Sequence, residues 1–254
     1  MNVGLCTISG GNRSVTAVMD AAADAGYDGV EIWGQDHVGN GEPSTCEEIL
    51  GEAHNRSLEI PVYGSYLRPG TDAFADKYAH ELDIARHLEA DLIRVWAGNQ
   101  EYQECTSNHW QAVIEDLVSL SDTAAEYGLG VTVEKHEGTV TNRHTGARQL
   151  IEAVDRDNCR LNYQPLFSLP NTDILSEARD LAPLSNNVHV QAVPERGGDE
   201  RCLLENAYYN VDELLSIFAE SGFDGYVNVE FVTENETYGD AVKRDLAFVR
   251  VCLE

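Results

Sequence analysis

Short apolar stretches alternate with longer segments of helical periodicity along the whole chain. The apolar stretches are rich in β-branched residues and alternate with period two, which is typical of strands. We expect strands at 2–8, 29–34, 59–66, 92–97, 130–136, 159–165, 187–193 and 226–232. We expect helices near 14–25, 45–57, 72–89, 109–127, 145–155, 173–182, 211–221 and 240–252. This regular alternation predicts parallel strands joined by crossover helices.

Several of the predicted helices carry signals for their first and last residues. Capping-box spacing occurs in three pairs: Ser44 with Glu47, Asn108 with Gln111, and Asn210 with Glu213. Glycines stand where three helices should end and the chain should turn into the next strand: Gly26, Gly128 and Gly222. These signals support the predicted order of strands and helices.

Parallel strands with crossover helices form either a closed barrel or an open doubly wound sheet. An open nucleotide-binding sheet normally has a glycine-rich phosphate turn after its first strand, but the stretch at 9–12 lacks the GxGxxG spacing. About eight strand–helix units in about 250 residues is the usual size of a (β/α)8 barrel. No linker or shift in composition divides the chain. We therefore predict an α/β fold, a (β/α)8 TIM barrel forming a single domain over residues 1–254.

The alternation of side chains along each strand predicts which residues face the interior of the barrel. Residues two apart share a face, so the apolar positions pack outward on helices and a polar row faces inward near the carboxyl end of each strand. Active sites of such barrels lie at that end. The inward residues predicted in this way are Glu31, Trp33, Arg94, Trp96, Glu134, His136, Gln164, His189, Gln191 and Glu230.

Two carboxylates and one histidine among these residues indicate chemistry. Glu134 and Glu230 each end an apolar strand, and His189 occupies the matching place on a strand between them. Acidic and imidazole ligands that meet in a concave apolar site are typical of a divalent metal centre. His136 is either a substrate contact or a packed histidine, and Trp33 and Trp96 are either walls of the site or part of the core.

The charge balance is strongly acidic. There are 44 Asp and Glu residues against 17 Lys and Arg, which gives a net charge of −27. An acidic, lysine-poor surface predicts a protein adapted to high salt, a halophilic source, with an ordinary acidic protein as the alternative. The field repels polyanions, so we expect neither nucleic acid nor an anionic membrane surface as a partner.

The cysteines and the lengths of the hydrophobic runs indicate in which cellular compartment we expect the protein. The six cysteines are scattered without a CxxC pair, so they predict neither a disulfide framework nor a zinc knuckle. No apolar run approaches the ~20 residues that span a bilayer. The first residues lack a basic region and are typical of a strand rather than a signal peptide. We expect a reduced, cytoplasmic protein.

Five segments that carry most of the predicted inward residues resemble the xylose isomerase-like TIM barrel superfamily. Its members include sugar isomerases, ketose 3-epimerases, inosose dehydratases and endonuclease IV. The resemblance covers nearly the whole chain and rests on the order and spacing of five segments, at 25–31, 93–98, 133–136, 187–190 and 224–230.

The resemblance implies four metal positions at the ends of strands five to eight. Glu134 matches the first glutamate of the family, His189 the histidine and Glu230 the last glutamate. The fourth position is usually an aspartate, and here it is Gln164. An amide oxygen can ligate a hard cation but brings no charge, so this departure should weaken metal binding.

The resemblance further implies an isomerase or epimerase of sugars or sugar phosphates that acts through an enediolate, with Glu134 and Glu230 as acid and base. The expected cofactor is Mn²⁺ or Mg²⁺, with Zn²⁺ or Co²⁺ as alternatives. The candidates for substrate contacts are Glu31, Trp33, Arg94, Trp96, His136 and Arg196.

Other functions remain open at this point. A dehydratase or lyase could use the same enediolate, and Gln164 motivates a non-catalytic sugar-binding barrel. A repair endonuclease is disfavoured because it needs more metal ligands and a cationic groove for DNA. The sequence leaves open whether the chain forms a homo-oligomer.

Overall fold

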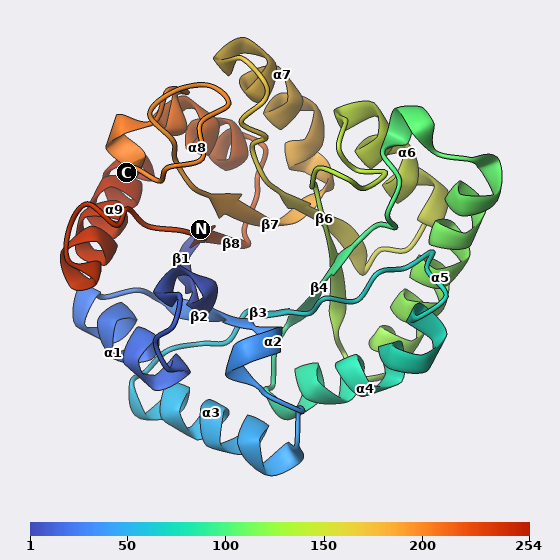
Figure 1. The fold of residues 1–254 in the computed structure, drawn as a ribbon, viewed down its shortest axis with the longest axis horizontal. Coiled ribbons are helices and arrows are strands. Elements are labelled where there is room, and N and C mark those ends of the chain that lie inside the picture. The colour runs from blue at the N-terminus through green and yellow to red at the C-terminus, as the bar shows by residue number, and fades with distance from the viewer.

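A computed structural model describes the backbone of residues 1–254 and every side chain except that of residue 35. Over these residues the strands form one closed parallel barrel in the order β1 to β8, with β8 pairing with β1 (Figure 1). The strands are β1 (Asn2–Cys6), β2 (Gly29–Trp33), β3 (Val62–Gly64), β4 (Leu92–Trp96), β5 (Gly130–Glu134), β6 (Cys159–Tyr163), β7 (Ser185–Val190) and β8 (Tyr226–Val229). The predicted (β/α)8 TIM barrel is confirmed.

Helices surround the barrel as an outer ring (Figure 1). Their bounds are α1 (Val15–Ala25), α2 (Gly34–His37), α3 (Pro43–Asn55), α4 (Phe74–His87), α5 (Ser107–Glu126), α6 (His144–Val154), α7 (Asn171–Leu181), α8 (Val211–Glu220) and α9 (Tyr238–Cys252). The last helix, α9, packs beside α1, so the ring of helices closes where the sheet closes. None of the helices in the described chain is both long and apolar enough to span a membrane.

The third strand is much shorter than the range 59–66 predicted for it. It begins at Val62, because Pro61 has no N–H to donate to a neighbouring strand. It ends at Gly64, where the chain turns and the N–H of Ser65 bonds back to the carbonyl of Tyr63 at 3.1 Å. A short, early-ending strand leaves a loop over the mouth of the barrel at this point.

The helix-start predictions were right at one position and wrong at two. The side chain of Asn210 accepts a hydrogen bond from the N–H of Glu213 at 3.2 Å, which confirms this cap. Ser44 lies inside α3, because Pro43 begins the helix with a φ that suits its first turn. Asn108 lies inside α5, whose cap is Thr106, accepting from the N–H of His109 at 3.2 Å.

A ladder of amides fills the interior of the barrel beneath its mouth. Asn228 donates to Asn187 at 2.9 Å, and Asn187 donates to Asn162 at 3.2 Å. Gly4 makes room for this ladder, since a Cβ there would lie 1.9 Å from Oδ1 of Asn228. The outer face follows the predicted parity too, because the buried Lys135 points away from the barrel and pairs with Glu177 of α7 at 2.9 Å.

Candidate active site

A cavity of about 310 Å³ opens at the carboxyl ends of the strands. Predicted inward residues from six strands or the loops that directly follow them line it: Glu31, Trp33, Arg94, Trp96, Glu134, His136, Gln164, Gln191 and Glu230. His189 lies directly against these residues but is itself only 1% exposed. The parity of the strands therefore brought the predicted residues to one place.

Ligand-type atoms converge on one ring nitrogen of His189. Its Nδ1 lies 3.6 Å from Oε1 of Glu230 and 4.0 Å from Oε1 of Glu134. All three side chains are buried, and one ligand atom from each lies within 4.8 Å of the others. Residues from β5 and β7 and from the end of β8 thus form a cluster that matches the predicted metal ligands.

Gln164 completes this cluster. One atom of its side-chain amide lies 3.0 Å from Oε1 of Glu134, 2.9 Å from Oε2 of Glu230 and 3.3 Å from Nδ1 of His189. If this atom is the amide nitrogen, it donates hydrogen bonds to both carboxylates. If it is the amide oxygen, it faces two carboxylate oxygens, and either a protonated Nδ1 of His189 or a cation among the four side chains would offset the repulsion.

The distances between these ligand atoms fit a divalent cation bound among them. Two neighbouring ligands of an octahedral Mg²⁺, with bonds of ~2.1 Å, lie about 3 Å apart. The separations of the Gln164 atom from the two carboxylate oxygens are 3.0 and 2.9 Å. Three oxygen ligands and one imidazole also suit Mn²⁺, and Zn²⁺ accepts the same donors. The residues present therefore fit a divalent metal.

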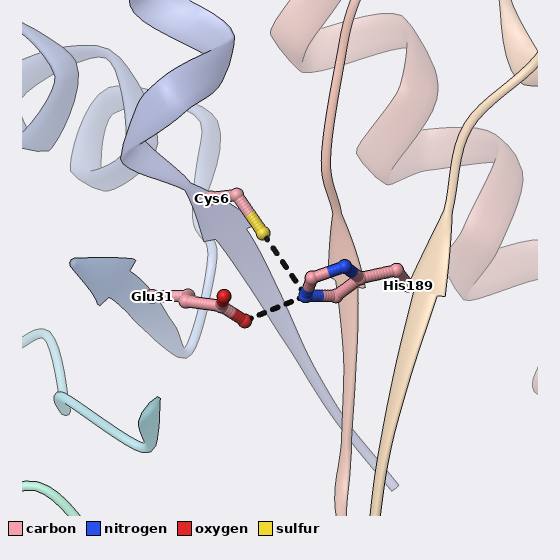
Figure 2. A group of neighbouring side chains, drawn as sticks. All are labelled: Cys6, Glu31 and His189. Carbon is pink, nitrogen blue, oxygen red and sulfur yellow. Dashed lines mark hydrogen bonds and ion pairs between the residues drawn. The ribbon is translucent and has the colours of Figure 1, made fainter. Parts of the chain in front are cut away.

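The other ring nitrogen of His189 is held from the opposite side. Figure 2 shows its Nε2 facing Glu31 and Cys6, with Nδ1 directed away from both. Nε2 lies 2.8 Å from Oε2 of Glu31 and 3.7 Å from Sγ of Cys6. A carboxylate that accepts a hydrogen bond from Nε2–H keeps the proton on that nitrogen and leaves the lone pair on Nδ1 for a metal. Glu31, predicted as a substrate contact, thus touches His189, the histidine predicted as a metal ligand.

Arg94 joins the two acidic sides of the cluster. Its Nε lies 3.2 Å from Oε1 of Glu31, and its Nη1 donates to Oε2 of Glu134. Trp96 donates to the same Glu134 oxygen at 2.5 Å, so Oε1 is the oxygen that faces His189. Gly64 of β3 leaves room for the guanidinium, since a Cβ there would lie 2.8 Å from Nη2 of Arg94.

Burial and the neighbouring charges together shift the pKa values of the acids and of the histidine in this cluster. Burial alone would raise the pKa of Glu31 and of Glu134, but His189 and Arg94 outweigh it and lower both. Burial and the charge of Glu134 raise the pKa of Glu230 to about 7. Burial would lower the pKa of His189, but Glu31 and Glu230 outweigh it and raise the value to about 9. A metal on Nδ1 would therefore displace a proton.

Aromatic rings form one wall of the cavity. Trp33 donates through Nε1 to the hydroxyl of Tyr66 at 2.5 Å, and Tyr66 meets Trp96 edge-on with ring centroids 5.1 Å apart. His136 lies against Trp96 at 5.0 Å and also lines the cavity. The two tryptophans therefore line this cavity rather than lying wholly in the core. Tyr66 was missed, because it follows the short β3 in a loop without periodicity.

One predicted residue lies elsewhere. Arg196 is exposed, donates through Nε to the carbonyl of Ser168 at 2.8 Å, and is not among the residues that line the cavity. Arg201, further along the same loop after β7, reaches the cavity instead. Cys6 was also missed, because it reads as one more apolar position at the end of β1.

Comparison with known proteins gives related barrels. The chain is 23% identical over 252 residues to a 3-dehydroshikimate dehydratase of Bacillus anthracis, a match that covers 92% of this chain and 86% of the relative. The structure of AsbF from Bacillus anthracis, a probable 3-DHS dehydratase, superposes with a TM-score of 0.83 at 21% identity, covering 98% of this chain and 99% of AsbF.

Two further solved structures have the same fold. The IOLI protein with a bound zinc atom superposes with a TM-score of 0.83 at 16% identity, covering 100% of this chain and 98% of that protein. A D-psicose 3-epimerase superposes with a TM-score of 0.77 at 16% identity, covering 100% and 99%. The family model described as xylose isomerase-like TIM barrel matches residues 19–252. This match extends over nearly the whole chain, which therefore belongs to the xylose isomerase-like TIM barrel family.

Proposed function

We propose that this chain is a metal-dependent isomerase or epimerase of a small polyhydroxylated carbonyl compound, a sugar or sugar phosphate, acting through an enediolate. The observation that carries the proposal is the convergence of one carboxylate oxygen each from Glu134 and Glu230, and of the side-chain amide of Gln164, on Nδ1 of His189 beside the cavity. These four side chains would hold the divalent metal. When bound, it would polarise the substrate carbonyl and stabilise negative charge on the neighbouring oxygens.

The proton transfers fall to the two glutamates. Glu230 is held by Gln191, whose Nε2 donates to its Oε2 at 2.7 Å, and Glu134 is held by Arg94 and Trp96. Each carboxylate thereby has one oxygen, Oε2, fixed by a donor and another, Oε1, directed toward Nδ1 of His189; Oε2 of Glu230 also lies beside the amide of Gln164. In the proposed reaction one glutamate takes the proton from the carbon next to the carbonyl, and the other returns a proton to the enediolate.

The walls of the cavity would orient the substrate. The rings of Trp33, Tyr66 and Trp96 offer apolar surface to the C–H face of a polyol, and His136 offers a ring nitrogen at the edge. The guanidinium of Arg94 forms ion pairs with both Glu31 and Glu134. We therefore propose that Arg94 positions these two carboxylates and does not bind a phosphate.

Hydrogen exchange with solvent tests the proposal. A panel of ketoses, aldoses and their sugar acids is incubated with the Mn²⁺-loaded protein in D₂O, and deuterium next to the carbonyl is measured by NMR. We expect exchange with at least one sugar, and a loss of roughly 100-fold or more in Glu134→Gln and in Glu230→Gln. Glu126→Gln, an exposed acid on α5, is the matched control. Exchange that is unchanged in both site variants would contradict the roles of Glu134 and Glu230, and no exchange with any compound of the panel would leave only a sugar-binding barrel.

A dehydratase is the second candidate, favoured by the similarity to the 3-dehydroshikimate dehydratase over 92% of the chain. Loss of water from the same enediolate needs only a leaving hydroxyl and an acid, which Glu134 or Glu230 would supply. Mass spectrometry of the products separates the candidates. A product of unchanged mass indicates isomerisation or epimerisation, and a product lighter by one water indicates dehydration.

A further inference from the structure

Arg201 occupies an unusual position in this acid-rich chain. Most of the other arginines are paired with carboxylates or bonded to backbone carbonyls, but Arg201 makes no ion pair or hydrogen bond with any described residue. It lines the 310 Å³ cavity and also the two hollows that adjoin it, of about 410 and 840 Å³. The unpaired guanidinium of Arg201 therefore lies where a ligand bound in the cavity would contact it.

Two aromatic rings hold the guanidinium in place. Its central carbon lies 4.8 Å from the ring centroid of Phe231 and 5.3 Å from that of Phe167. Cation–π contacts on flat rings leave the edge of the guanidinium, with its N–H groups, available to a ligand. Burial lowers the pKa of Arg201, with Glu230 and Asp199 as the nearest opposing charges, yet neither acid forms an ion pair with it.

An unused acceptor lines the same cavity. Gln191 is only 4% exposed, and its Nε2 donates to Glu230 while its Oε1 has no partner among the described residues. The hydroxyl of Tyr209 donates to the Gln191 carbonyl at 2.7 Å and so fixes the backbone at this position. A buried acceptor without a donor costs free energy unless a ligand hydroxyl satisfies it.

The charges that line the cavity add a constraint. Three carboxylates, Glu31, Glu134 and Glu230, face two guanidiniums, Arg94 and Arg201. With a divalent cation on the cluster and His189 neutral, the charged side chains that line this cavity sum to one net positive charge. Asp199 lies in the adjoining hollows and is not part of this sum. A ligand with one negative charge would neutralise this positive charge, whereas a neutral sugar would leave a half-buried cation unpaired.

We propose that Arg201 and Gln191 form a subsite for the carboxylate and a hydroxyl of the ligand, so that the substrate is a polyhydroxylated acid rather than a neutral sugar. The inference rests on the proposed function and names its substrate class. A single planar guanidinium matches the two oxygens of a carboxylate. A phosphate monoester carries up to two charges and would need further donors, yet Asp199 and Glu200 flank this side of the cavity.

Paired ligands that differ by one carboxylate test the subsite. D-gluconate and D-glucitol have the same six-carbon skeleton, and D-glucitol 6-phosphate carries a phosphate instead. Their binding is measured by calorimetry on the Mg²⁺-loaded protein and on protein treated with EDTA. We expect gluconate to bind more tightly than both other ligands. Equal binding of gluconate and glucitol, or no binding of gluconate, would overturn the inference, and preference for the phosphate would overturn the carboxylate assignment.

Two arginines of one loop supply matched variants. Arg201→Gln should weaken gluconate binding by about tenfold to 100-fold and leave glucitol binding unchanged. Arg196→Gln removes the same charge outside the cavity and should change neither. Arg201→Lys keeps the charge without the planar fork and should give an intermediate loss, which also covers the case in which Arg201→Gln does not fold. Equal effects of the Arg201 and Arg196 variants would contradict the subsite.

The two proposals fail in different ways. Preference for gluconate that persists with EDTA, but no hydrogen exchange with any substrate, would retain the subsite and reject the proposed enzyme. Hydrogen exchange on neutral sugars with no preference for acids would retain the enzyme and reject the subsite.

Discussion

Nε2 of His189 lies 2.8 Å from Oε2 of Glu31, although the two residues are 158 positions apart in the sequence. The contact fixes which ring nitrogen carries the proton, and so directs the lone pair of Nδ1 toward Glu134, Gln164 and Glu230. Glu31 therefore acts on the proposed metal through the histidine, from the opposite side of its ring (Figure 2).

Replacing Glu31 should weaken metal binding without removing a proposed ligand. We expect Glu31→Gln to lower Mn²⁺ affinity by about 10- to 100-fold, since an amide no longer holds the Nε2 proton with a negative charge. Calorimetric titration of the metal-free protein measures this. Glu126→Gln, which removes the same charge from an exposed position, should bind Mn²⁺ like the wild type. Equal affinities in all three proteins would show that Glu31 does not position His189.

Placing a carboxylate at position 164 should lower the stability of the metal-free protein and increase the stabilisation that a metal provides. The amide atom of Gln164 lies 3.0 and 2.9 Å from oxygens of Glu134 and Glu230, so a third carboxylate here would be repelled in the absence of a cation. We expect Gln164→Glu to lower the Tm of the metal-free protein by several degrees and to enlarge the rise in Tm on adding Mn²⁺. Gln103→Glu, an exposed change, is the control. A Tm that Mn²⁺ raises equally in both variants would argue against Gln164 as a ligand.

Much of this site follows from strand parity, and the exceptions have physical causes. Glu134 and Glu230 end apolar strands, so alternation alone places them at the barrel mouth. Arg201, Tyr66 and Cys6 carry no such signal. Arg201 lies in the long loop between β7 and α8, where no periodicity indicates direction. Cys6 continues an apolar strand, and Pro61 shortens the third strand so that Tyr66 belongs to a loop.

The fold itself was predictable because each strand–helix unit repeats the same pattern, whereas the interactions between units were not. The pairing of Lys135 with Glu177 joins β5 to α7, and that of Glu31 with His189 joins β2 to β7. Such contacts depend on the closure of the barrel, and local sequence does not encode them.

Asp245 should make stability depend on pH. This buried residue of α9 accepts from the N–H of Leu204 at 2.9 Å, and its other oxygen has no partner among the described residues. Burial raises its pKa from 3.8 to about 7. A raised acid pKa means that the folded state favours the proton, so its stabilising contribution is present below about pH 4 and is lost as the pH rises through 7.

Asp245→Asn mimics the protonated acid and should remove this loss. We expect the variant to exceed the wild type in free energy of unfolding by on the order of 2 kcal/mol at pH 8, and by clearly less at pH 5. Urea denaturation at both pH values measures the difference. Asp224→Asn, an exposed change, should show no such dependence. A variant that is no more stable at pH 8 than the wild type would contradict the ionisation assigned to Asp245.

The net charge of −27 predicts stabilisation by salt. Repulsion among surface carboxylates opposes the compact state, and salt at molar concentration shortens its range to about 3 Å. We expect the free energy of unfolding to rise by about 1 kcal/mol or more between low and molar KCl at pH 8. Near pH 5, close to the sequence pI of about 4.4, the rise should be much smaller. An equal response at both pH values would indicate that screening is not the cause.

The central claim is that Glu134, Gln164, His189 and Glu230 share one divalent cation. Anomalous diffraction at the manganese edge, from crystals grown with Mn²⁺, tests this most directly. The predicted result is a strong peak within bonding distance of Nδ1 of His189 and of oxygens from the other three residues, and no peak there in crystals of Glu134→Gln/Glu230→Gln. Wild-type crystals without a peak at this position would contradict the account.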